Sequence, residues 1–241
     1  MLLGCGGGGD GGDSSPPQSG ALPLGAYGGT LTGSTSSQFQ ALALPGGEFW
    51  SLYGYDAGSI FYVEGFVQGS GSSNNHTFTT RDLRDFGFAP ALQATMTASY
   101  DIAARTISGT SNYDGQTVRF SGGPIPGSLY HYDDIASLST VVGHWDAMST
   151  EGGMVSINIQ ANGALTLSDN GCTGSGTIRT QNNGGNVFIV SVTFGGLPCA
   201  MPNQTATGIA IAYPLSTGQT QMIAAATNSA RTVGIAVFGI R

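Results

Sequence analysis

Short segments in which apolar and polar residues alternate run through most of this chain. Val155, Ile157 and Ile159 fall on one side of such a segment, with polar residues between them. A period of two is the pattern of a β-strand with one buried face. Asn162-Gly163 follows and predicts a two-residue hairpin turn, because both residues tolerate positive φ. The pattern predicts an all-β fold.

These segments group into two domains. Residues 22–123 form the first predicted domain and residues 141–241 the second, each with about eight short strands separated by turn residues. Residues 124–140 form a linker in which Asp133 or Asp134 would cap a short helix. Eight strands suit a barrel whose interior is filled by side chains or holds one small ligand. We expect two tandem antiparallel β-barrels, with two sandwiches as the alternative.

Charged residues are scarce, at 9% of the chain, and the formal net charge is −7. The chain has no lysine, and all seven basic residues are arginines. Because no basic stripe is available to neutralise phosphates, we expect no nucleic-acid partner. Arg81-Asp82-Leu83-Arg84-Asp85-Phe86 is the one segment of the first domain that predicts a helical turn, with its mixed charges on a solvated face.

The N-terminal Leu2-Leu3-Gly4-Cys5 resembles a bacterial lipobox, in which the cysteine is lipidated and becomes the new N-terminus. The rest of residues 1–21 is rich in Gly, Ser and Pro and predicts a disordered tether. The resemblance implies an outer-membrane protein anchored through a lipid on Cys5, with a signal peptide extending upstream. It leaves open whether the protein faces the cell surface or the periplasm. The alternative is an unmodified cysteine in a disordered terminus.

The remaining cysteines, Cys172 and Cys199, form a pair. An exported protein folds in an oxidising compartment, so we expect a disulfide between them. Two reduced thiols in a cytosolic protein are the alternative. A metal site is less favoured, because neither a C-x-x-C spacing nor a nearby histidine accompanies the two cysteines.

Two segments around these cysteines and the C-terminal segment resemble a family of uncharacterised Gram-negative outer-membrane lipoproteins. They are Gly171–Ile178, Val190–Cys199 and the ending from Asn228-Ser229-Ala230-Arg231 to Phe238-Gly239-Ile240-Arg241. The family implies tandem small β-barrels behind a tether and no established activity. More loosely, the layout is similar to that of surface lipoproteins that bind host transferrin or complement factor H.

Aromatic residues crowd two neighbouring predicted strands of the first domain. Alternation places Phe49, Tyr53 and Tyr55 on one face and Trp50 on the other. Both faces of a barrel strand cannot be core, so some of these rings should be exposed, and Trp50, Tyr53, Tyr55 and Tyr62 are a candidate binding face. The favoured interpretation is that these rings fill a core or a contact between the barrels.

No catalytic motif is present, and without lysine the chain cannot form a Schiff base. His131, Asp133 and Asp134 are a weak candidate metal site, and inter-domain packing is favoured for them instead. We therefore expect no enzyme and no cofactor. The sequence favours a lipid-anchored envelope protein that binds a protein or a small ligand. The alternatives are a structural lipoprotein without a ligand and a barrel-type protease inhibitor.

Overall fold

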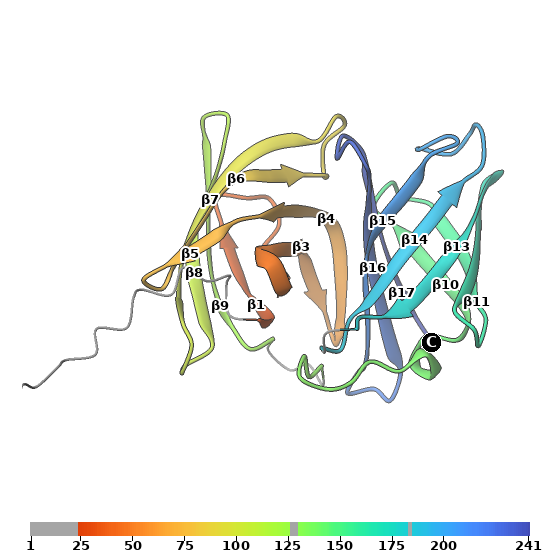
Figure 1. Ribbon diagram of the computed structural model, residues 1–241, viewed down its shortest axis with the longest axis horizontal. Helices are drawn as coiled ribbons and strands as arrows, with labels where there is room; N and C mark the ends of the chain where they lie inside the picture. Colours follow the sequence, from red (N-terminus) through yellow and green to blue (C-terminus); the bar gives the residue numbers. More distant parts are fainter. Residues whose placement is uncertain (1–23, 126–129, 183–184) are drawn as a thin grey trace, which may run out of the picture.

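The computed structural model describes residues 24–125, 130–182 and 185–241. Its regular structure consists of seventeen strands and two 3-10 turns, with no α-helix among the described residues. None of the helical segments in this part of the chain is long and apolar enough to cross a membrane. The strands form two antiparallel barrels that lie side by side (Figure 1). The prediction of two eight-stranded barrels is confirmed, and the sandwich alternative is wrong.

In the first barrel, β1–β4 and β6–β9 follow one another around the ring in chain order. The ring closes where β1 pairs with β9 and where Val67 and Gln68 of β4 pair with Asp85 and Arg84 of β6. The short β5 pairs with β6 beside this ring. The strands are β1 Gly25–Thr32, β2 Gln38–Ala43, β3 Glu48–Ala57, β4 Ile60–Ser70, β5 Ser72–Asn74, β6 Thr77–Asp85, β7 Leu92–Asp101, β8 Thr106–Tyr113 and β9 Gln116–Gly123, and the 3-10 turn η1 spans Pro45–Gly47.

The second barrel is an up-and-down meander that closes where β10 pairs with β17. Val155, Ile157 and Ile159 are buried in its core, as the alternation predicts. The strands are β10 Gly143–Ser149, β11 Met154–Ile159, β12 Ala164–Asp169, β13 Cys172–Thr180, β14 Phe188–Phe194, β15 Thr205–Pro214, β16 Thr220–Asn228 and β17 Gly234–Ile240.

The hairpin between β11 and β12 is one residue longer than predicted. The N–H of Gln160 donates to the carbonyl of Ala164 at 2.8 Å, which leaves residues 161–163 as the loop. Gly163 has a φ of 83°, whereas the φ of Asn162 is not positive. A three-residue loop needs one left-handed residue, at its end, and Gly163 supplies it.

The segment between the barrels contains a 3-10 turn, η2, over Leu138–Thr140. Neither Asp133 nor Asp134 caps it, because the N-cap position falls later in the chain, at Ser137, whose side chain makes no capping hydrogen bond. Asp133 instead pairs with Arg105 at 3.0 Å in an exposed ion pair. The expected capped helix is therefore replaced by a shorter turn further along the linker.

An apolar interface joins the outer faces of β3 and β4 to the second barrel. Figure 1 shows β4 next to that barrel. The rings of Phe66 and Phe86 stack with centroids 4.7 Å apart, and Trp50 stacks on Phe66 at 5.9 Å. From the second barrel the interface receives Ile209, Ile211, Tyr213, Ile223 and Phe238. Because one apolar cluster spans both barrels, each barrel buries apolar surface of the other.

Polar contacts of Gln221 and Arg231 cross the same boundary. The fully buried amide of Gln221 donates to the carbonyl of Phe61 at 2.8 Å and accepts from its N–H at 3.2 Å. Arg231, in the β16–β17 hairpin, donates to the carboxylate of Asp82 at 2.6 Å and to the carbonyl of Gln68 at 2.9 Å. Buried polar groups stabilise only arrangements that satisfy them, so these contacts fix the orientation of one barrel on the other.

Candidate functional site

The first barrel is hollow toward one end. A cavity of about 600 Å³ lies inside it, within the range of small-molecule sites. Three segments form its rim. They are the β1–β2 loop, the β6–β7 connection with Phe88 and with Leu92 at the start of β7, and the turn between β8 and β9 that contains Asp114. Phe88 is 54% exposed and Leu92 is 39% exposed, so the rim is open to solvent.

Apolar side chains form most of the cavity wall. They are Leu31, Phe39, Phe49, Val67, Met96, Ile107, Val118 and Phe120. Phe39 and Phe120 meet edge to face with centroids 5.9 Å apart, and Phe49 packs against the fully buried Phe78. These aromatic contacts fill the barrel interior beyond the cavity, so an occupant has access to an apolar surface backed by packed rings.

The cavity exists because small side chains occupy inward positions. Ser51 on β3 and Ser111 on β8 line it directly, and Ala94 and Ala98 on β7 belong to the same core. An eight-stranded ring has a roughly fixed diameter, so side-chain volume decides whether its interior is filled. Serine and alanine at these positions leave that volume open.

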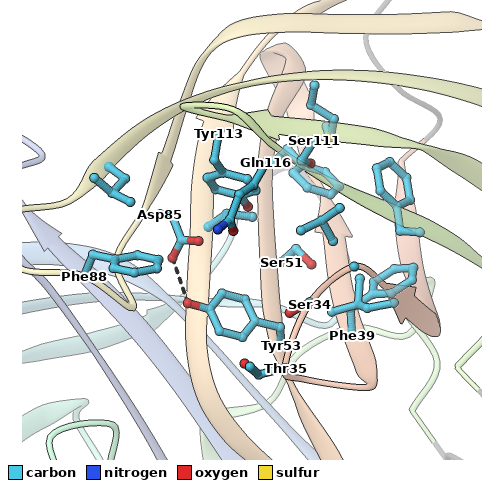
Figure 2. Close-up of a pocket in the computed structure, with 18 of the residues that line it drawn as sticks. Ser34, Thr35, Phe39, Ser51, Tyr53, Asp85, Phe88, Ser111, Tyr113 and Gln116 are labelled. Carbon is cyan, nitrogen blue, oxygen red and sulfur yellow. Dashed lines mark hydrogen bonds between the residues drawn. The ribbon is translucent and has the colours of Figure 1, made fainter.

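A polar cluster stands in this wall around the carboxyl of Asp85, which is only 4% exposed. The hydroxyl of Tyr53 donates to its Oδ1 at 2.7 Å, and the backbone N–H of Gly87 donates to the same atom at 2.9 Å (Figure 2). The hydroxyl of Tyr113 lies near the carboxyl and lowers its pKa. Two donors thus converge on one oxygen of this carboxyl at the cavity wall.

Burial raises the pKa of Asp85, and the hydrogen bonds from Gly87, Tyr53 and Tyr113 oppose that rise. Burial, followed by the nearby Asp85 carboxyl, raises the pKa of Tyr53 and of Tyr113 far above the ordinary value. Both phenols therefore stay protonated at neutral pH and act as donors. In this cluster the carboxyl of Asp85 accepts hydrogen bonds from the Tyr53 hydroxyl and the Gly87 N–H, which hold it in place.

Two glycines make room for Tyr53. A Cβ on Gly65, which pairs with Tyr53 across β3 and β4, would lie closer to the tyrosine ring than any real contact allows. A Cβ on Gly87 would likewise collide with its hydroxyl. The ring is thus held between β4 and the β6–β7 loop, which directs its hydroxyl at Asp85.

Sequence reasoning missed Asp85 because β6 is irregular. Its pairing with β7 shifts register between Thr80 and Leu83, and the Thr80 hydroxyl accepts from the N–H of Asp82 at 3.0 Å. The predicted helical turn at residues 81–86 is therefore wrong: the segment is a bulged strand that turns Leu83 and Asp85 inward. The alternation itself carried the signal: the buried positions run Phe78, Thr80 and then, after one extra residue, Leu83 and Asp85.

The four residues of the expected aromatic face are separated by the fold. Tyr53 lines the cavity, whereas Trp50 is 3% exposed and lies in the inter-barrel interface. Tyr55 is 43% exposed and does not line the cavity. Tyr55 stacks on Tyr62, and Tyr62 meets Phe238 of the second barrel edge to face. Of the four, only Tyr53 reaches the cavity.

The linker candidates do not form a metal site. His131 is exposed, and Asp133 is paired with Arg105. Among the described residues, no group of three or more His, Cys, Asp or Glu side chains is placed to hold a metal ion. Cys5 and the tether lie outside the described residues.

The predicted disulfide between Cys172 and Cys199 is confirmed. It ties the start of β13 to the β14–β15 loop, whose Met201 is fully buried in the core of the second barrel. The cavity in that barrel is about 180 Å³. The loop therefore fills one part of the second barrel and the disulfide holds it there.

No protein-family model matches this chain, and no curated protein matches it. Among solved structures it is similar to a protein of unknown function from the DUF3598 family of Nostoc punctiforme PCC 73102. The two share 10% identity over 90% of this chain and 94% of the other, with a TM-score of 0.28, which is too low to support a conclusion. The resemblance to Gram-negative lipoproteins, including those that bind transferrin or factor H, gains no support from these comparisons.

Proposed function

We propose that this protein is a non-enzymatic binding protein whose first barrel encloses a small, largely apolar molecule. The observation that carries the proposal is the open cavity of about 600 Å³, with apolar walls and one convergent polar cluster around Asp85. Small-molecule sites combine these features: apolar walls supply affinity, and a few placed polar groups fix orientation. Barrels of eight strands are wide enough to hold one such ligand.

The chemistry of the wall supports binding over catalysis. A serine nucleophile needs an adjacent base to take its proton. Ser51 and Ser111 line the cavity, but no described hydrogen bond joins either hydroxyl to a carboxylate or a histidine. The carboxyl of Asp85 is engaged by fixed donors instead. This arrangement suits recognition of a ligand.

The test of this proposal is binding of the neutral fluorophore Nile red. We expect the dye to bind wild-type protein with micromolar affinity and to gain emission in the apolar cavity. Ser51→Phe places a ring inside the cavity and should weaken binding at least about tenfold. Ser108→Phe is the matched control, because Ser108 is exposed on β8 and its variant should bind like wild type.

Thermal unfolding of each variant establishes that it is folded before dye is added. Absence of dye binding to folded wild-type protein would contradict the proposal. Equal binding by wild type and Ser51→Phe would also contradict it, since the dye would then sit elsewhere.

The proposal includes attachment of this binding protein to the outer membrane through a lipid on Cys5. The disulfide supports an oxidising compartment, where exported proteins fold. Intact-mass analysis of protein expressed from its native locus and extracted from membranes tests this step. A diacylglyceryl or triacyl mass that disappears in Cys5→Ser is the expected result. An unmodified Cys5 in wild-type protein would refute the anchor and leave the binding test unaffected.

A further inference from the structure

We infer that the molecule bound in the first barrel carries a cationic amine on its apolar body, and that the carboxylate of Asp85 receives this amine. The inference rests on the proposed function and deepens it by naming the ligand class. It follows from three features of the cavity: the charges that line it, the surroundings of Asp85, and the apolar wall beyond.

The charge of the cavity is of one sign. Its lining includes the carboxyl groups of Asp85 and Asp114, and no arginine or histidine stands among the lining residues. The chain supplies no lysine anywhere and carries a formal net charge of −7. An anionic ligand would therefore meet like charges at the wall, whereas a cation would meet only opposite ones.

Asp85 lacks a cationic partner within the described structure. Each described ion pair involves another acid: Arg105 with Asp133, His144 with Asp146, and Arg231 with Asp82. Tyr53 and Gly87 both donate to Oδ1 of Asp85, and donors of this kind favour the ionised carboxyl. A buried carboxylate without a counter-ion is costly, so a cation that enters the cavity would be stabilised there.

Aromatic rings complete the surroundings of this carboxyl. Phe88, Tyr53 and Tyr113 all line the cavity, and Figure 2 shows them around Asp85, with the Phe88 ring directed toward it. The faces of such rings attract cations in addition to offering apolar contact. A carboxylate framed by aromatic rings is a suitable receptor for an alkylammonium group, whose charge meets the carboxylate while its carbons meet the rings.

The apolar wall fixes the rest of the ligand. Beyond Asp85 the cavity continues between Phe39, Val67 and Met96, which offer no hydrogen-bonding side-chain group. A hydrocarbon chain or a ring system matches this surface, because its burial removes apolar area from water. The class that satisfies both ends is a primary or secondary amine on a hydrophobic body.

The test compares three ligands of equal chain length: n-octylamine, n-octanol and octanoate. Isothermal titration of wild-type protein at neutral pH should rank octylamine at least about tenfold tighter than octanol, with octanoate weakest. Equal binding of the amine and the alcohol, or tighter binding of octanoate, would overturn the inference. This ranking uses wild-type protein and needs no variant to fold.

Asp85→Asn then identifies the receiving group. It should reduce octylamine binding to the level of octanol and leave octanol binding within about threefold of wild type. Asp114→Asn is the matched control: it removes an equal charge from the rim and should keep most of the amine preference. Equal loss in both variants would overturn the assignment to Asp85.

The outcomes separate this inference from the proposed function. If Ser51→Phe weakens Nile red binding but wild-type protein shows no preference for octylamine over octanol, only the inferred ligand class is refuted. If wild-type protein binds neither Nile red nor octylamine, the proposed binding function itself is refuted.

Discussion

Trp145 and Phe188 fill the interior of the second barrel, whereas Ser51 and Ser111 occupy inward positions of the first. The two rings are built from the same number of antiparallel strands, yet their cavities measure about 600 and 180 Å³. Strand number sets the diameter of a barrel, and side-chain volume sets what remains inside. The difference teaches that one architecture can enclose an open cavity in one barrel and a packed core in the other.

The ends of the two barrels also differ in how far side chains fill them. In the second barrel the β14–β15 loop places Met201 in the core and is fastened by the disulfide. In the first barrel Phe88 at the rim is more than half exposed, and Asp85 brings a polar cluster into the wall. The second barrel is therefore closed by apolar packing where the first stays open and polar.

The largest expected effect contrasts one phenylalanine in each barrel. Phe188→Ala should lower the free energy of unfolding by about 3–5 kcal/mol, because it removes a fully buried ring from a packed core. Phe120→Ala should cost about 2 kcal/mol or less, since that ring already borders open space. Urea unfolding measures both. Equal losses would show that the two interiors are packed alike.

Reduction of the disulfide comes next and concerns the second barrel. Opening the Cys172–Cys199 link, which spans a sequence separation of 27, should lower the free energy of unfolding by about 3–4 kcal/mol. The measurement is urea unfolding with and without dithiothreitol. The double variant Cys172→Ser/Cys199→Ser is the control, because its unfolding curve should not respond to the reductant. A wild-type curve that ignores the reductant would contradict the role given to the disulfide.

The smallest expected effect is a pH dependence that only the first barrel shows. Burial raises the folded-state pKa of Asp85 above the ordinary 3.8 of an aspartate. Between the two values the folded protein holds a proton that the unfolded chain has released. The stability from this proton is therefore present at low pH and is lost as the pH rises through the folded pKa.

Asp85→Asn removes that titration. The stability of the variant relative to wild type should rise as the pH increases from 3 through the folded pKa. Thermal unfolding across the pH series measures the difference, and Asp114→Asn controls for the change in net charge. A difference that stays constant with pH would be incompatible with a buried, titrating Asp85.

Regular alternation and cysteine count were enough to predict the strands, the two barrels and the disulfide. Val155, Ile157 and Ile159 show why: in a strand without interruption, the burial of each residue follows from its position alone. The cysteine pairing was predicted from the two cysteines outside the N-terminal segment and from the expectation of an oxidising compartment.

The candidate site depends on features that break this period. The register shift between Thr80 and Leu83 adds one residue to β6 and reverses the faces of the residues that follow. Asp85 reaches the inner face for this reason. The burial of Trp50 depends on a partner surface far along the chain, around β15–β17, which no local pattern indicates.

The shared apolar interface has a consequence for how such a gene can change. A chain severed between the barrels would leave Trp50, Phe61 and Phe66 of one half, and Ile211, Ile223 and Phe238 of the other, facing water. Neither half could then be inherited or exchanged alone without becoming prone to aggregate. Recombination that swaps one barrel must bring a matching face with it, so the two barrels are expected to be inherited together.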